Sequence, residues 1–151
     1  MYRNILVPID GSDTAQRGLH EAIALAKSLG SRIRLLHVIN EAPLLSPVAM
    51  GASFDRIFEQ MRNYGTSILH VAEAAVRDSG VEAETQLIEA NGGLAGEHIL
   101  REAASWPAHL IVCGTHGRRG VRRIVVGSDA EYVVRQSNVP VLLVRARPGG
   151  R

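Results

Sequence analysis

The residues most able to do chemistry in this chain lie in one segment near its C-terminus. Residues 114–128 read GTHGRRGVRRIVVGS and contain four glycines and four arginines. An apolar run precedes the segment, and a helical pattern begins just after it. A glycine-rich turn between a strand and a helix suits an anion, because ligands can approach glycine backbone closely and the N–H groups at the helix start point toward them. The segment therefore predicts a cradle for the phosphates of a nucleotide.

A second interpretation stays open at this level, in which the segment is a basic surface loop whose glycines only make turns. The P-loop pattern GxxxxGK[ST] is absent, and GxGxxG does not follow the first strand. What remains is the spacing Gly114-x2-Gly117-x9-Gly127-Ser128. The arginines, of which Arg118 is the first, suit either interpretation, since they can neutralise phosphates or form a solvated surface.

The elements that must position this segment alternate along the chain. Apolar runs predict strands at 4–9, 32–39, 81–89, 109–113 and 140–145. Helical spacing of apolar residues predicts helices at 14–29, 54–79, 94–106 and 129–137. The alternation implies one domain of α/β class, with an open, mostly parallel sheet covered by helices on both faces. We expect this domain to span 1–147, followed by a frayed tail at 148–151.

In such sheets, ligands bind outside the carboxyl ends of the strands, where the strand order reverses. If the first and fourth strands are neighbours, Asp10 and the loop that starts at Gly114 face one crevice. Pro8 is expected at the end of its strand because it cannot donate to a ladder. The turn at 10–13 is expected to cap the first helix through Ser12.

Composition excludes several classes of protein. The charge is nearly balanced, with 17 basic and 15 acidic side chains, which gives no reason to expect a nucleic-acid partner. No apolar run approaches the roughly 20 residues of a membrane span, and the N-terminus lacks the features of a signal peptide. The single cysteine, Cys113, cannot form an internal disulfide. These features are typical of a cytoplasmic protein.

Taken together, several segments resemble the universal stress protein (UspA-like) family, in particular its ATP-binding branch. These segments are NILVPIDGS at 4–12, LLHVI at 35–39, LIVCGTHGRRGVRRIVVGSDAEYVV at 110–134 and VPVLLVR at 139–145. The resemblance covers essentially the whole chain. It implies a five-stranded parallel sheet of order 3-2-1-4-5 in a Rossmann-like fold, akin to the adenine nucleotide alpha hydrolases. It also implies a homodimer that pairs through the last strand, residues 139–145.

The resemblance assigns roles to individual residues. Pro8 and Ile9 would line the adenine pocket, Asp10 would contact the ribose or adenine side of ATP, and Val38 would hold adenine through its backbone. The residues expected at the ribose and phosphates are Gly114, Gly117, Gly127 and Ser128, and the segment also brings Cys113, Arg118 and Asp129 to the site.

Two residues depart from the family pattern. Asp129 stands where a small or aliphatic residue is common, and its carboxylate would repel phosphates unless a divalent ion bridged them. Alternatively, Asp129 serves as a helix-dipole partner in the first turn and points away from the ligand. Cys113 stands where methionine is common and is expected to be buried.

The function expected from this pattern is a dimeric, ATP-binding regulatory or signalling module in stress response. ATP is the expected ligand, with or without Mg²⁺ or Mn²⁺. Two alternatives stay open: a slow metal-dependent ATPase or phosphoryl-transfer enzyme, and an interaction protein whose site binds no nucleotide. No catalytic residue is predicted, because no Ser-His-Asp pattern exists and the one lysine, Lys27, lies on the first helix. The histidines lack zinc-ligand spacing, and His37 is interpreted as structural.

Overall fold

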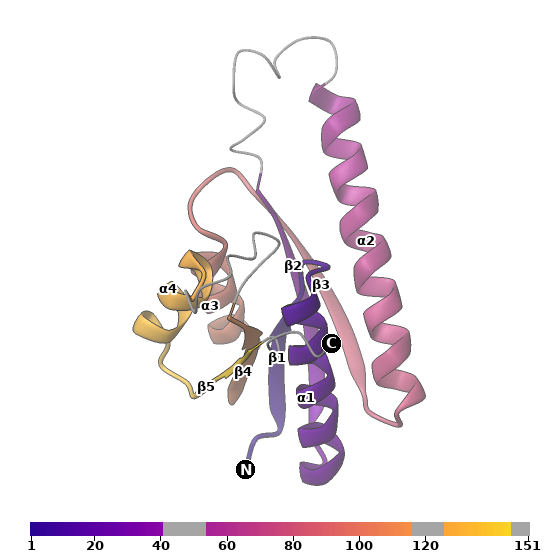
Figure 1. Ribbon diagram of the computed structural model, residues 1–151, viewed down its shortest axis with the longest axis vertical. Helices are drawn as coiled ribbons and strands as arrows, with labels where there is room; N and C mark the ends of the chain where they lie inside the picture. The colour runs from indigo at the N-terminus through magenta and orange to yellow at the C-terminus, as the bar shows by residue number, and fades with distance from the viewer. Residues whose placement is uncertain (41–53, 116–125, 146–151) are drawn as a thin grey trace, which may run out of the picture.

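A computed structural model describes residues 1–40, 54–115 and 126–145. It contains one parallel sheet of order β3-β2-β1-β4-β5 (Figure 1). The strands are β1 (Asn4–Pro8), β2 (Arg32–Asn40), β3 (Ala83–Ala90), β4 (Leu110–Gly114) and β5 (Val141–Val144). The helices are α1 (Asp13–Leu29), α2 (Phe54–Asp78), α3 (Ala95–Ser105) and α4 (Ser128–Gln136).

The sequence-based expectations for the fold are confirmed. Each expected strand and helix is present with ends within two residues of those expected, and the strand order is the one that the resemblance implies. The chain thus forms a single α/β domain. The predicted boundary between a domain at 1–147 and a tail at 148–151 stays a prediction, since residues beyond 145 lie outside the described part of the chain.

Helices cover the sheet on both faces, with α1 and α2 on one side and α3 and α4 on the other (Figure 1). Side chains of β1 alternate between the two cores. Ile5 and Val7 pack with α1 and α2, whereas Leu6 packs with α3 and α4, and all three are fully buried. Burial on both faces accounts for the continuous apolar runs of the central strands. Among the described residues, no helix combines the length and the apolar character needed to cross a membrane.

The turn after β1 sets the start of α1 as the sequence predicts. The Ser12 N–H donates to Oδ1 of Asp10 at 2.9 Å, and Oγ of Ser12 accepts from the Ala15 N–H at 3.2 Å, which is an N-cap. Helix α1 ends at Gly30, which adopts a left-handed conformation with φ of 66°. β1 therefore ends at Pro8, and Asp10 is held just beyond it.

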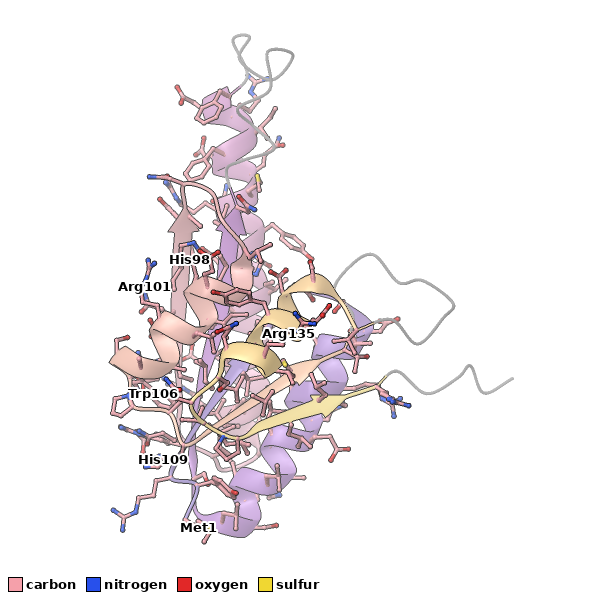
Figure 2. All side chains as sticks on the ribbon, turned by 90° about the vertical axis from the view of Figure 1, so that its left-hand side faces the viewer. Met1, His98, Arg101, Trp106, His109 and Arg135 are labelled. Atoms are coloured by element: carbon pink, nitrogen blue, oxygen red, sulfur yellow. The ribbon has the colours of Figure 1, made fainter. Side chains whose placement is uncertain are left out.

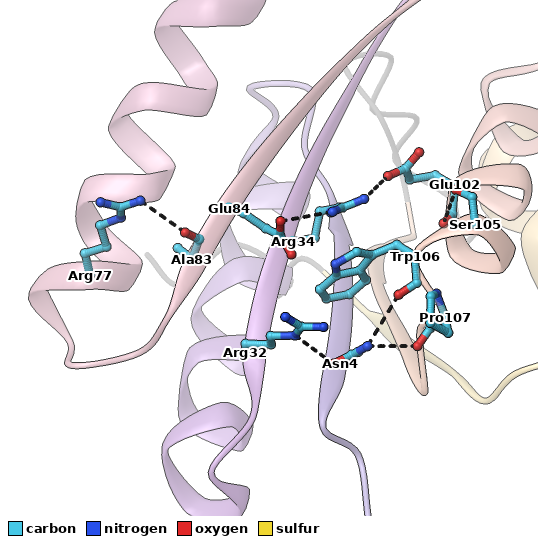
Figure 3. A network of polar contacts seen from close by, with 10 residues as sticks. All are labelled: Asn4, Arg32, Arg34, Arg77, Ala83, Glu84, Glu102, Ser105, Trp106 and Pro107. Atoms are coloured by element: carbon cyan, nitrogen blue, oxygen red, sulfur yellow. Dashed lines mark hydrogen bonds and ion pairs between the residues drawn. The ribbon is translucent and has the colours of Figure 1, made fainter.

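A polar network fixes the amino-terminal part of the sheet to α3 (Figure 3). The Arg34 guanidinium on β2 bridges Glu84 on β3 and Glu102 on α3, and it stacks 4.8 Å from the centre of the Trp106 ring. Partial burial alone would raise the pKa of Glu84, but the hydrogen bond and charge of Arg34, together with Trp106 and Arg32, outweigh it, so this pKa lies below its usual value. The network anchors α3 at its C-terminal end, which leaves its N-terminus at the opposite end of the sheet.

Candidate functional site

The carboxyl ends of the strands surround a cavity of about 650 Å³. It lies where the strand order reverses, because β1 and β4 are parallel neighbours and the helices that follow them, α1 and α4, lie on opposite faces of the sheet. Nine of the eleven predicted site residues line this cavity: Pro8, Ile9, Asp10, Val38, Cys113, Gly114, Gly127, Ser128 and Asp129. The other two, Gly117 and Arg118, lie outside the described residues.

Gly114 is needed for packing at the end of β4. A Cβ at this position would lie 2.8 Å from the backbone carbonyl carbon of Thr14 and 2.8 Å from its Oγ1. The missing side chain therefore lets the first turn of α1 approach the end of β4. Gly114 does not adopt a positive φ, so the left-handed conformation that glycine permits is not its use here. Close approach of two backbones is the reason for glycine at this point of the cavity wall.

Gly127 forms the start of α4. Its N–H donates to the Thr115 carbonyl at 2.6 Å, and its own carbonyl accepts from the Glu131 N–H at 2.9 Å. Gly127 occupies the N-cap position with φ of −58°, and in the described structure no side chain caps this helix. The first N–H groups of a helix have no acceptor within the helix. Ser128 and these N–H groups therefore present hydrogen-bond donors at the cavity.

Asp129 makes a contact that the sequence did not reveal. Its Oδ1 accepts from the Gly96 N–H, at 3.0 Å, in the first turn of α3. The N-cap residue of α3 is Leu94, which makes no side-chain capping bond, so the carboxylate from α4 takes that role. This contact agrees with the interpretation of Asp129 as a helix-dipole partner, but the helix whose N–H it accepts from is α3, not its own.

Helices α3 and α4 approach closely enough for this contact because residue 96 is glycine. A Cβ at Gly96 would lie 3.0 Å from the Asp129 carbonyl oxygen and 3.0 Å from Cδ1 of Tyr132. The start of α3 also lines the cavity. The sequence analysis predicted this helix but did not predict that its start belongs to the site. The sequence contained a signal for this part of the site, because the glycines of the turn at 91–93 precede α3 much as Gly127 precedes α4.

Cys113 is buried at the end of β4, as expected. The residue is 6% exposed, and burial raises the pKa of its thiol to about 11. Uncharged sulfur is therefore the form that lines the cavity at neutral pH.

A ring of contacts behind the cavity holds the end of β1. Nδ1 of His37 lies 2.8 Å from the Ile9 carbonyl oxygen. The Tyr64 hydroxyl donates to the Asp10 carbonyl at 3.4 Å, and the His37 and Tyr64 rings meet edge to face at 6.3 Å. His37 was assigned only a structural role from the sequence, because histidine without ligand spacing carries no signal for a site.

The candidate site contains no protein cage for a metal ion within the described ranges, since no group of three or more histidine, cysteine, aspartate or glutamate side chains is gathered there. Asp10 and Asp129 each direct one oxygen to a backbone N–H. These two side chains are therefore the carboxylate ligands that the described part of the cavity offers to a divalent cation.

Comparison with known proteins gives a consistent relationship. The profile of the universal stress protein family matches residues 1–145. The chain belongs to the universal stress protein family. Universal stress protein YxiE of Bacillus subtilis is 36% identical over 151 residues, which cover 96% of this chain and all of YxiE. The relationship inferred from the sequence motifs is thereby confirmed.

Solved structures agree with this assignment. The structure of MJ0577, a universal stress protein of Methanocaldococcus jannaschii, has a TM-score of 0.87 at 26% identity and covers 99% of both chains. A family member from Burkholderia pseudomallei has a TM-score of 0.79 at 30% identity, covering 96% of this chain and 97% of that one. Two further family structures, at 21% and 24% identity and TM-scores of 0.67, are complexes with cAMP and, for a protein from Archaeoglobus fulgidus, with dAMP.

Replacement of Asp129 tests its contact with α3. We expect Asp129→Ala to lower the free energy of unfolding by about 1 kcal/mol, because the Gly96 N–H and the dipole of α3 lose their partner. Urea unfolding followed by circular dichroism measures the change. Glu131→Ala is the matched control, since Glu131 lies in the same turn and forms an exposed pair with Arg135 at 3.2 Å. Equal effects of the two substitutions would contradict the capping role.

The burial of Cys113 predicts slow thiol chemistry. With a pKa of about 11, about one thiol in a thousand is ionised at pH 8. We expect Ellman's reagent to label the folded protein at least about tenfold more slowly than the protein unfolded in guanidinium, measured by absorbance. Labelling at the same rate in both states would show that the thiol is accessible and ionisable.

Proposed function

We propose that this universal stress protein binds ATP or a related adenine nucleotide, and that the bound nucleotide regulates its interactions in stress response. The observation that carries the proposal is the meeting of three helix N-termini, those of α1, α3 and α4, around one cavity at the reversal of strand order. Such N-termini favour negative charge.

The three helix starts differ in a way that favours α4 as the phosphate site. At α1, Ser12 caps the helix and Asp10 accepts from the Ser12 N–H. At α3, the Asp129 carboxylate accepts from Gly96. At α4, Gly127 has no side chain, and no capping bond from a side chain is made among the described residues. The first turn of α4 contains Asp129 and Glu131, but the Asp129 carboxylate accepts from Gly96 of α3. A ligand phosphate would supply the acceptor that the first N–H groups of α4 lack.

The remaining parts of the nucleotide suit the opposite side of the cavity. Asp10 has a second carboxylate oxygen beyond the one bound by Ser12, and ribose hydroxyls can donate to it. Pro8, Ile9 and Val38 offer apolar surface and backbone groups at the ends of β1 and β2. The volume of about 650 Å³ is in the ordinary range for sites that bind small organic ligands.

The complexes of family members with cAMP and dAMP support an adenine ligand in general terms. Their identity to this chain is low enough that they establish the shared fold, so the proposal rests on the cavity of this chain. We favour regulation over catalysis because Asp10 and Asp129, the carboxylates at the cavity, already accept from backbone N–H groups. ATP hydrolysis and an empty site are the outcomes that would overturn this choice.

We also propose that the protein is a homodimer that pairs through β5. This strand lies at the edge of the sheet, and no further strand of the described residues pairs with its outer side. All four of its residues are apolar, and Leu142 is 37% exposed. The opposite edge, β3, carries charged and polar side chains such as Glu84 and Glu89, which discourage pairing. A cytoplasmic location remains a prediction from the sequence.

Calorimetric titration of nucleotide-free protein with ATP and Mg²⁺ tests the ligand. We expect binding without phosphate release. Ser128→Asp should weaken ATP binding at least about tenfold, because a carboxylate at the start of α4 repels the phosphates. Ser67→Asp, on the exposed side of α2, is the matched control and should bind as the parent does. Steady phosphate release would favour the ATPase alternative, and absence of heat with the parent protein would favour the empty site.

Light scattering tests the dimer. We expect twice the monomer mass at micromolar concentration and a monomer for Leu142→Asp, since a charge at the centre of the paired strands cannot be buried without cost. Val71→Asp is the matched control, because Val71 is 65% exposed on α2, away from β5. A parent protein with monomer mass, or a dimeric Leu142→Asp, would contradict pairing through β5.

A further inference from the structure

The ladder between β1 and β2 stops at a defined point. β1 pairs with β2 through Pro8, which lies opposite Leu36. One more backbone bond follows, in which the Ile9 N–H donates to the Leu36 carbonyl at 2.8 Å. The next bond of a regular parallel ladder would join the Val38 N–H to the Ile9 carbonyl.

The direction of the Val38 backbone follows from the alternation of β2. The Arg32 N–H donates to Arg3 next to β1, and Leu36 accepts from Ile9 on the same side. Ile33 is an odd-numbered residue of the strand, and its N–H donates instead to Glu82 next to β3. Val38 is separated from Arg32 and Leu36 by an even number of residues, so its backbone groups point the same way as theirs. Its N–H and C=O groups therefore face the side of β1, beyond the point at which β1 has ended.

His37 takes the acceptor that Val38 would otherwise use. Nδ1 of His37 lies 2.8 Å from the Ile9 carbonyl oxygen. A carbonyl only accepts hydrogen bonds, so Nδ1 carries the proton and donates it. Among the backbone bonds of the described residues, none joins Val38 to Ile9. Val38 instead lines the cavity, and a main-chain N–H there needs a partner from solvent or ligand.

The imidazole is held in place from the α2 side. His37 is 9% exposed and packs edge to face against Tyr64. Gly65 makes room for the ring, because a Cβ at that position would lie 2.6 Å from Cδ2 of His37 and 3.0 Å from Cδ1 of Leu87. The hydrogen bond to Ile9 is thus built into the packing of α2 on β2.

We propose that His37 is a positioning residue for base recognition: by binding the Ile9 carbonyl, it ends the β1–β2 ladder and leaves the Val38 N–H free to bind the base, beside the Val38 C=O that lies beyond the end of β1. A backbone N–H beside a C=O matches adenine, which presents the N1 acceptor next to the N6 donor. Hypoxanthine presents the reverse pattern, a donor at N1 and an acceptor at O6, and is disfavoured. The inference rests on the proposed nucleotide site and adds the residue that sets its base selectivity.

The test compares dissociation constants for ATP and ITP by calorimetry in the parent and in His37 variants. The parent should prefer ATP. His37→Leu removes the donor, so the Ile9 carbonyl accepts from Val38 and the preference should fall about tenfold, the value of roughly one hydrogen bond. The amide nitrogen of His37→Asn can occupy about the position of Nδ1, so this variant should retain most of the preference.

His109→Leu is the matched control. Nδ1 of His109 accepts from the Asn4 N–H at 3.2 Å, at the amino end of the same strand β1, and Figure 2 places His109 near Met1, at the end of the molecule away from the cavity. This variant should keep the preference of the parent for ATP. If His37→Leu does not fold, Gly65→Ala replaces it, because the added methyl group crowds the ring, and the same ratio of dissociation constants decides.

Hydrogen exchange of the Val38 amide, followed by NMR without ligand, separates this inference from the proposed function. The amide should exchange at least about tenfold more slowly in His37→Leu than in the parent, because it then has a backbone acceptor. A parent that binds no nucleotide would overturn the function but leave this readout intact. Unchanged exchange together with an unchanged ATP preference in the variant would overturn the role of His37.

Discussion

The site depends on one constraint, the reversal of strand order between β1 and β4. The helices that follow these parallel neighbours, α1 and α4, lie on opposite faces of the sheet. β1 ends at Pro8 and β4 at Gly114, so backbone groups beyond these ends lack the partners that a continuing sheet would supply. The polar contacts around the cavity satisfy some of the backbone groups at these strand ends and at the helix starts beside them.

In each of these contacts, a side chain from one element binds a backbone group at the end of another. The Ile9 carbonyl is bound by a β2 side chain, the start of α3 by a side chain from α4, and the start of α1 by Asp10 from the end of β1. Each contact reduces the number of orphan groups without filling the cavity. The cost of leaving the rest unpaired is offset by the two apolar cores, whose strand residues are fully buried on both sides of β1.

The fold could be predicted from the sequence because its signals are local. Apolar runs, a Ser12 cap and a Gly30 stop each act within a few residues, and a strict alternation of strands and helices leaves few arrangements. The cavity residues at the strand ends and at the start of α4 were also predictable, because chain direction brings strand ends together and the family resemblance names these residues, whereas the start of α3 was not predicted. Their partners were not predictable: Asp129 binds a backbone group 33 residues away and His37 one 28 residues away, and no local pattern encodes such pairs.

Partners that lie far apart in the sequence also decide how the two carboxylates of the site act on an anion. In the sequence, Asp129 stands beside the predicted phosphate segment, and two negative charges close together repel each other. The sequence did not reveal which group the Asp129 carboxylate binds. In the fold, its carboxylate accepts from the N-terminus of α3, where the helix dipole offsets part of its charge. Asp10 is offset in the same way at α1. The two carboxylates thus satisfy the helix starts they touch. The start of α4, capped by a residue with no side chain, keeps backbone N–H groups to which an anion can bind, with Asp129 of its first turn directed to α3.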